Sequence, residues 1–193
     1  MRELFFFSNN KNKIIEIKKI FKKFNFKIVS LSDLEISGEP KENGKTFEEN
    51  AKIKSDYGFN KTGIPCFADD SGICIEALIW KPGVLSKRFL INFKSNKSCF
   101  KSIIENTKKN GKKNAYFKTS ISLTMGKDQN IVFNGKIDGK ISDKIKGKFG
   151  FGYDPIFIPN HYKKTLAELS TKEKNEISHR SIAVTKLINF LSN

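Results

Sequence analysis

The sequence contains no hydrophobic run long enough to cross a bilayer. Its longest apolar stretches, such as Leu4–Phe7 and Ile156–Ile158, span a few residues each, whereas a transmembrane helix needs about 20. The N-terminus also lacks the extended apolar region and the small-residue cleavage site of a signal peptide. These absences predict a soluble protein of the cytoplasm with no membrane partner.

Cysteine is scarce, and its spacing fits no cross-linked or metal-binding framework. The three residues, Cys66, Cys74 and Cys99, are odd in number and far apart, which argues against a disulfide scaffold and a CxxC zinc site. We therefore expect each of them to be a buried, small hydrophobic side chain.

Internal repeats, low-complexity tracts and Pro/Gly/Ser-rich linkers are also absent. The chain has 193 residues, of which 38% are hydrophobic and 12% aromatic. It can therefore bury a sizeable core, which excludes wholesale disorder. Residues 1–193 are expected to form a single domain, or at most two lobes around one cleft.

Arginine is rare, at Arg2, Arg88 and Arg180, yet the formal net charge is +16. Such an excess of cations is typical of proteins with nucleic-acid or other anionic partners. The alternative is a compositional bias toward lysine, asparagine, isoleucine and phenylalanine, as in genomes rich in A and T. Because the lysines are spread along the chain instead of forming one block, we expect no specific nucleic-acid partner.

Hydrophobic periodicity and turn residues predict an α/β protein whose mixed sheet is flanked by helices. The expected strands are Leu4–Phe7, Phe26–Val29, Pro65–Ala68, Ile73–Ile75, Ala115–Met125, Asn130–Ile137 and Pro155–Ile158. The expected helices are Ile14–Phe24, a helix begun by a capping box at Thr46 and running to Phe59, Ser98–Lys109, and Ser181–Leu191. Turns are expected at Asp69–Gly72 and, within a hairpin, at Gly126–Asp128.

The polar stretch Ser8–Lys13 lies between a predicted strand and a predicted helix. Free N–H groups and the positive dipole end of a helix favour bound phosphate, and Lys13 adds a charge. The stretch lacks the spacing of a Walker A loop. The alternative interpretation is an ordinary helix N-cap with a solvated lysine.

Two adjacent carboxylates, Asp69 and Asp70, follow an apolar strand. Such groups hold Mg²⁺ or activate a water molecule, although a turn closed by Gly72 explains them equally well. Since consecutive strand residues point to opposite faces, we expect one of the two aspartates to face a cleft.

A second acidic ligand is sought at Glu42, because Glu49 already has a structural role in the capping box. Metal binding by Glu49 stays open. Asn50 and Lys54 are four residues apart and share a helix face. They either direct an amide and an ammonium group toward a triphosphate or are solvated.

The segment Phe149–Pro155 combines glycines, which allow close backbone approach, with aromatic rings on which a base can stack. Phe149 is interpreted as a core aromatic residue of a turn. Asp154 is expected to be extended because it precedes Pro155. Further along, His179 next to Arg180 at a helix start, with Lys174 nearby, is placed to read a base edge or a phosphate. The alternative for His179 is a capping or surface residue.

Five segments, in this order, resemble the family of non-canonical purine nucleoside triphosphate pyrophosphatases, the inosine/xanthosine triphosphate pyrophosphatases. The match runs from Ser8 to about Arg180. The segments are Ser8–Lys13, Thr46–Ala51, Ala68–Gly72, Gly150–Phe157 and Ile177–Arg180. Each is weak alone, whereas five in the right order are highly specific.

The resemblance implies Mg²⁺-dependent hydrolysis of ITP, dITP and XTP to the monophosphate and pyrophosphate, which cleanses the nucleotide pool. It also implies a homodimer and an elongated mixed β-sheet with two lobes around a nucleotide cleft. Asp70 would be the catalytic base, and Glu42 and Asp70 would hold the metal. The residues implied in substrate binding are Ser8, Asn9, Asn10, Lys11, Asn12, Lys13, Lys54, Ser71, Phe151, Gly152, Tyr153, Asp154, Lys174, His179 and Arg180.

This chain departs from the family pattern at several positions. Asn9 and Asn12 stand where the family often has glycine, Leu85 where it has tyrosine, Lys87 where it has alanine, and Phe149 where it has glycine. These departures bear on affinity and selectivity more than on the class of reaction. The rival interpretations are a nucleic-acid-binding protein, a nucleotide sensor without turnover, and a broader or pyrimidine-directed phosphatase.

Overall fold

The computed structural model describes residues 2–22, 24, 26–34, 36 and 38–192 of the chain. It has the predicted α/β class, with a sheet that contains both parallel and antiparallel pairs. The strands are β1 (Arg2–Phe6), β2 (Phe26–Ser30), β3 (Cys66–Ile75), β4 (Lys81–Pro82), β5 (Asn114–Gly126), β6 (Gln129–Ile141) and β7 (Phe157–Pro159). The α-helices are α1 (Lys11–Phe21), α2 (Phe47–Thr62), α3 (Ser86–Ile91), α4 (Asn96–Asn110), α5 (Thr171–Ile177) and α6 (His179–Ser192).

The chain divides into two compact units, each assembled from separate stretches of sequence. The first unit comprises Met1–Asp70, Thr119–Gly135 and Ser181–Asn193. The second comprises Ser71–Lys118 and Lys136–Arg180. Each unit has its own buried apolar side chains, and the two-lobed cleft expected from the sequence stays a prediction.

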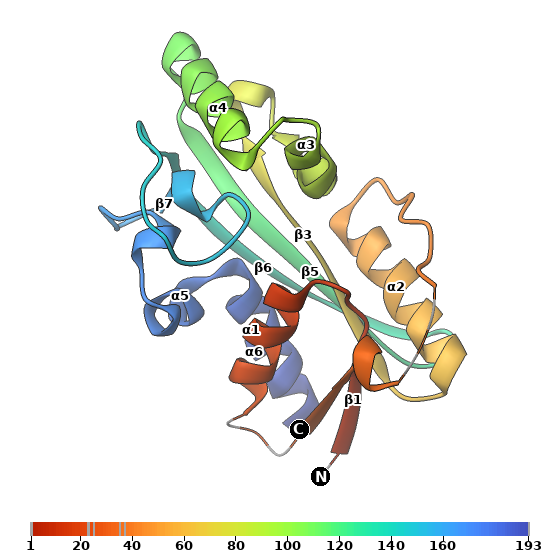
Figure 1. The fold of residues 1–193 in the computed structure, drawn as a ribbon. Coiled ribbons are helices and arrows are strands. Elements are labelled where there is room, and N and C mark those ends of the chain that lie inside the picture. The colour runs from red at the N-terminus through yellow and green to blue at the C-terminus, as the bar shows by residue number, and fades with distance from the viewer. Residues whose placement is uncertain (1, 23, 25, 35, 37, 193) are drawn as a thin grey trace. The chain divides into compact units, whose positions relative to one another are not determined.

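In the first unit, strand β1 is buried on both faces. It pairs in parallel with β2 and with β3. On one face, Phe6 shares a core with Ile17 of α1 and Leu187 of α6, two helices that lie side by side in Figure 1. On the other face, Phe7 packs against Tyr57 of α2, with ring centroids 5.4 Å apart. A strand covered on both faces requires a continuous apolar run, as the sequence has here.

In the second unit, helix α4 supplies much of the core. Its apolar side chains recur every three or four residues, so they form one buried stripe that includes Phe100 and Ile103. This stripe packs with Ile75 of β3, Phe117 of β5 and Phe157 of β7. Figure 1 shows α4 in green, next to α3. Helix α4 thereby covers apolar side chains of the sheet.

The region around the paired aspartates corrects the largest error of the sequence analysis. The structure has one uninterrupted strand, β3, where two strands and a turn at Asp69–Gly72 were expected. Gly72 serves close packing instead of a turn, because a Cβ atom there would lie 2.2 Å from the carbonyl oxygen of Gly83. The turn-forming composition is thus overridden by tertiary packing.

Other boundaries shift by a few residues. Helix α1 ends at Phe21, not at Phe24, whose side chain is exposed, and α2 continues past Phe59 to Thr62. Strand β7 begins at Phe157, because Pro155 belongs to a 3₁₀ turn that spans Asp154–Ile156. The backbone of Asp154 is therefore helical, and the expected extended conformation is wrong.

Several smaller predictions are confirmed. The capping box at Thr46 and the β5–β6 hairpin are both present. All three cysteines are buried free thiols. Within the ranges that the structure describes, no helix is long and apolar enough to cross a membrane.

Candidate active site

The predicted phosphate loop in the first unit is built around the N-cap of α1. The Asn10 side chain accepts hydrogen bonds from the N–H groups of Asn12 (3.1 Å) and Lys13 (3.3 Å). The Ser8 hydroxyl accepts a hydrogen bond from the N–H of Asn10. The cap interpretation therefore holds for Asn10, while Lys11 and Asn12 are exposed at the start of the helix.

Lys13 is held by an ion pair, which contradicts the interpretation of a solvated lysine. Its Nζ lies 3.0 Å from Oδ2 of Asp69, a carboxylate whose side chain is fully buried. The neighbouring loop residue Asn9 donates a hydrogen bond to Glu39, at the start of the loop that leads to α2. The phosphate loop is thus tied to two other parts of the same unit.

The two adjacent aspartates point to different elements, as expected for consecutive residues of a strand. Asp69 contacts Lys13 on α1, whereas Asp70 contacts α2. Asp70 Oδ2 accepts a hydrogen bond from Asn50 Nδ2 at 3.2 Å, and its Oδ1 lies 4.0 Å from Lys54 Nζ. One carboxylate is therefore surrounded by a helix face that carries an amide and an ammonium group.

Burial raises the pKa of Asp70 above the ordinary value for an aspartate. The ammonium groups of Lys54 and Lys13 and the hydrogen bond from Asn50 act in the opposite direction, and the carboxylate of Glu42 adds to the increase. A carboxylate with a raised pKa among cations is a typical general base.

Glu42 joins this group through Lys54. Its carboxylate lies 3.1 Å from the Lys54 ammonium group, so one cation contacts two separate carboxylates, Glu42 and Asp70. Glu49 is engaged elsewhere, because its side chain accepts hydrogen bonds from the backbone N–H groups of Lys45 (2.6 Å) and Thr46 (3.3 Å). The geometry favours Glu42 over Glu49 as the second acidic ligand.

The arrangement of Glu42 and Asp70 fits a Mg²⁺ ion. Both carboxylates lie near one cation, the ammonium group of Lys54, so a second cation would also be attracted to them. Across the described parts of the chain, no group of three or more His, Cys, Asp or Glu side chains could hold a metal. Mg²⁺ does not need such a group, because it typically binds one or two carboxylates together with water and substrate phosphates.

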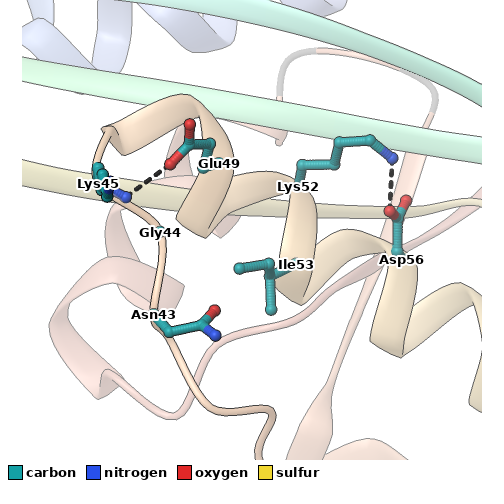
Figure 2. Close-up of a pocket in the computed structure, with 7 residues that line it drawn as sticks. All are labelled: Asn43, Gly44, Lys45, Glu49, Lys52, Ile53 and Asp56. Atoms are coloured by element: carbon teal, nitrogen blue, oxygen red, sulfur yellow. Dashed lines mark hydrogen bonds and ion pairs between the residues drawn. The ribbon is translucent and has the colours of Figure 1, made fainter.

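An open pocket of about 550 Å³ lies on a different face of α2 (Figure 2). Its lining residues are Asn43, Gly44, Lys45, Glu49, Lys52, Ile53 and Asp56. Three of its charged side chains already have partners: Glu49 accepts the backbone N–H of Lys45, and Lys52 pairs with Asp56 at 2.6 Å. None of the predicted site residues lines it, so we assign it no role in the reaction.

In the second unit, two cations flank the ring of Phe151. The Nζ of Lys174 lies 4.7 Å from the ring centroid, and the guanidinium carbon of Arg180 lies 5.5 Å from it. Lys174 also forms a buried ion pair with Asp154 at 2.7 Å. Asp154 Oδ2 accepts the backbone N–H of Phe151 at 2.8 Å, so the ring, the lysine and the loop are fixed together.

His179 and Arg180, at the start of α6, are both buried, so the alternative of a surface histidine is wrong. His179 stacks on Phe117 with ring centroids 4.7 Å apart and planes 9° apart. Arg180 is 2% exposed and donates to the hydroxyl of Ser71 at 3.1 Å. The structure therefore brings together five of the predicted base-binding residues: Ser71, Phe151, Asp154, Lys174 and Arg180.

Tyr153 is buried, whereas Phe149 is exposed. The Tyr153 ring lies in the core of the second unit, and its hydroxyl donates to the carbonyl oxygen of Ser86 at 2.8 Å. Burial raises the pKa of that hydroxyl. Phe149, interpreted as a core residue, is 60% exposed. At this position the hydrophobic pattern is misleading, because the loop turns its side chain to solvent.

Comparison with known proteins places this architecture in a family. The model of the Ham1 family matches residues 4–190. A dITP/XTP pyrophosphatase of Christiangramia forsetii is 40% identical over 190 residues, which are 98% of this chain and 99% of that protein.

Two solved structures have the same fold over almost the whole chain. The Ham1 protein of Staphylococcus aureus superposes with a TM-score of 0.87 at 35% identity, over 99% of this chain and 98% of that one. A HAM1 protein of Coxiella burnetii superposes with a TM-score of 0.88 at 33% identity, over 100% and 99% of the two chains. The resemblance inferred from the five motifs is confirmed: this chain belongs to the Ham1 family.

Proposed function

We propose that this chain hydrolyses the non-canonical purine nucleoside triphosphates ITP, dITP and XTP to the monophosphate and pyrophosphate. Its enzyme class is that of its curated relatives, the nucleoside triphosphate pyrophosphatases. The observation that carries the proposal is the group formed by Asp70, Lys54 and Glu42, with Asp70 buried and its pKa raised.

The reaction is an attack of water on the α-phosphorus with departure of pyrophosphate. Asp70 accepts a proton from the water, a role that suits a carboxylate whose pKa lies above the ordinary range. Lys13 and Lys54 neutralise negative charge that develops on the pyrophosphate. The loop Ser8–Lys13 would bind the phosphates at the start of α1, where the positive end of the helix dipole favours anions and Asn10 caps the helix.

Glu42 and Asp70 would hold a Mg²⁺ ion in this scheme. When bound, Mg²⁺ neutralises charge on the phosphate oxygens. Lys54 contacts both carboxylates, so it pairs with them in the absence of a divalent cation. We expect it to contact the triphosphate when substrate is present.

Selectivity is assigned to the second unit. Inosine and xanthosine carry a carbonyl at purine position 6, where adenine carries an amine. Lys174 and Arg180 are cationic donors that are 5% and 2% exposed, and the backbone N–H groups of Gly152 and Tyr153 would add to them. An adenine amine facing such donors would lose about 1–3 kcal/mol per unsatisfied group, so the set favours a carbonyl.

Product analysis tests this function. The protein is incubated with Mg²⁺ and ITP, XTP, ATP or GTP, and pyrophosphate is separated from orthophosphate. We expect pyrophosphate with IMP or XMP, and little product from ATP. GTP carries the same 6-carbonyl as ITP, so its turnover measures whether the 2-amino group of guanine is rejected as well. Orthophosphate as the product would refute the assigned bond cleavage, and comparable turnover of ATP would refute the assigned selectivity.

We also propose that the chain acts in the cytoplasm, where free nucleotides occur.

We propose in addition that the chain forms a homodimer. Exposed apolar side chains in the second unit support the dimer, among them Ile79 (84% exposed) and Trp80 (46%), because large exposed apolar groups often mark interfaces. Light scattering should give twice the chain mass, and Ile79→Lys should shift the equilibrium toward the monomer. A wild-type protein that is monomeric at micromolar concentration would refute this assignment.

A further inference from the structure

Asn50 has a contact pattern that the reaction scheme above does not use. It lies on α2, its side chain is buried, and the residue is 4% exposed. Its amide nitrogen donates to Oδ2 of Asp70 at 3.2 Å, and its amide oxygen accepts the backbone N–H of Gly44 at 2.8 Å. One side chain therefore connects the predicted catalytic base to the turn that precedes the helix.

Gly44 packs closely against two residues of α2, Asn50 and Glu49. A Cβ atom at Gly44 would lie 2.7 Å from the amide oxygen of Asn50 and 2.7 Å from Cβ of Glu49. A side chain at position 44 would therefore displace the Asn50 amide or Glu49, so glycine suits this position. Gly44 lies two residues after Glu42, so its hydrogen bond to Asn50 also restrains the loop that carries the second carboxylate.

Lys54 lies one helical turn after Asn50, on the same face of α2. Its ammonium group contacts Glu42 at 3.1 Å and lies 4.0 Å from Asp70. The two helix residues therefore interact with the site in different ways. Lys54 attracts Glu42 and Asp70 through its charge, a role that a metal ion can take over. Asn50 forms directional hydrogen bonds to Asp70 and to the backbone N–H of Gly44.

We propose that Asn50 is a positioning residue: it fixes the orientation of the Asp70 carboxylate relative to the loop that carries Glu42. The assignment rests on the proposed function for the roles of Asp70 and Glu42. The amide donates to one oxygen of Asp70, which restricts rotation of the carboxylate about its χ2 angle. The two carboxylates are then held in one relative arrangement before a cation or substrate arrives.

Two substitutions separate the two halves of this contact. Asn50→Ala removes both hydrogen bonds. Asn50→Asp has nearly the same shape and keeps an acceptor for the Gly44 N–H, but it loses the donor to Asp70. The matched control is Asn60→Ala, which changes an exposed asparagine of the same helix.

Two quantities are measured for each variant: the kcat and KM for ITP, and the affinity for Mn²⁺ alone by titration calorimetry. We expect both Asn50 variants to lose about 10- to 100-fold in kcat or in Mn²⁺ affinity, the range known for groups that orient metal ligands. The KM for ITP should stay within about threefold of wild type, and Asn60→Ala should match wild type in every measurement. Urea titration gives the folded fraction to which all values refer.

A double-mutant cycle with Asp70→Asn distinguishes positioning from general structural support. If Asn50 acts through Asp70, Asn50→Ala should weaken Mn²⁺ binding in the wild type but have almost no further effect in Asp70→Asn. Equal losses in both backgrounds would refute the assignment. So would an Asn50→Asp variant with wild-type kcat and Mn²⁺ affinity, because its donor to Asp70 is gone.

The outcome for the proposed function is separate. If the wild-type protein releases no pyrophosphate from ITP, the proposed function fails, while the Mn²⁺ titrations still test the position of Asp70. If the wild type is active and the Asn50 variants match it, the positioning role fails and the proposed function stands.

Discussion

Two ion pairs, one in each unit, differ in how far their side chains are exposed to solvent. In the first unit, Lys54 pairs with Glu42, whose side chain is 38% exposed. In the second unit, Lys174 pairs with Asp154, and both side chains are at most 6% exposed. Asp154 is further fixed by the backbone of Phe151. Solvent can therefore reach the Lys54–Glu42 pair, whereas the Lys174–Asp154 pair is enclosed in a packed loop.

This difference matches the division of labour that we propose. Phosphates and a divalent cation exchange partners during each turnover, so the groups that bind them benefit from access to solvent. Discrimination between a carbonyl and an amine needs donors that cannot turn away, because a mobile donor would satisfy either base. The substitutions below test this contrast.

The largest effect is expected for Asp70→Asn. Removing a general base typically costs about 10²–10⁴ in rate, so kcat for ITP should fall by that factor. Since burial raises the pKa of Asp70, its charged form is disfavoured in the folded protein, and a neutral amide should not lower the Tm. A folded variant with wild-type turnover would contradict the role of Asp70 as the base.

The contrast between the units predicts different losses of stability. Lys174→Met leaves a buried carboxylate unpaired and should cost about 3–5 kcal/mol in the free energy of unfolding. Lys54→Met breaks a more exposed pair and should cost less than about 1 kcal/mol. Urea denaturation of both variants measures the difference. Equal losses would mean that the two units hold their charges equally tightly.

Selectivity should depend on the start of α6. We expect Arg180→Ala and His179→Ala to lower the ratio of kcat/KM for ITP over ATP by about 5- to 150-fold, the equivalent of 1–3 kcal/mol. Arg180 touches the ring of Phe151 and the hydroxyl of Ser71, so its removal should have the larger effect. Unchanged ratios in both variants would contradict the assignment of base recognition to this unit.

The smallest effect is expected at Glu49. Its side chain closes the capping box of α2, so Glu49→Ala should lower stability by about 1 kcal/mol or less and leave kcat unchanged. The matched variant Glu42→Gln should raise the Mg²⁺ concentration needed for half-maximal turnover. The reverse pattern would assign the second metal ligand to Glu49.

Much of the fold follows from local pattern. The capping box at Thr46, the hairpin turn at Gly126–Asp128 and the amphipathic helix after Arg180 are encoded within a few residues of sequence, and the structure has all three. The error at Asp69–Gly72 has a different origin. Aspartate, serine and glycine favour turns, but β3 stays extended because distant segments pack against it.

The candidate site shows the same limit. Lys13, Asp70 and Arg180 stand out in the sequence because of their motifs, yet their partners come from elements far away in the chain. Asn50 shares a helix face with Lys54, so the sequence placed its amide toward a triphosphate or in solvent, whereas the structure buries it against Asp70. Its contact with Asp70 depends on how α2 lies on the sheet, which no local spacing encodes.

Because the three cysteines are buried, the reactivity of each thiol reports local opening of the unit that contains it. Cys66 belongs to the first unit, and Cys74 and Cys99 belong to the second. Burial raises the pKa of all three thiols, that of Cys99 to about 11, and a thiol reacts through its thiolate. A thiol reagent should therefore modify each cysteine chiefly when its surroundings open. Peptide-resolved labelling rates would then rank the two units by kinetic stability without any substitution in the chain.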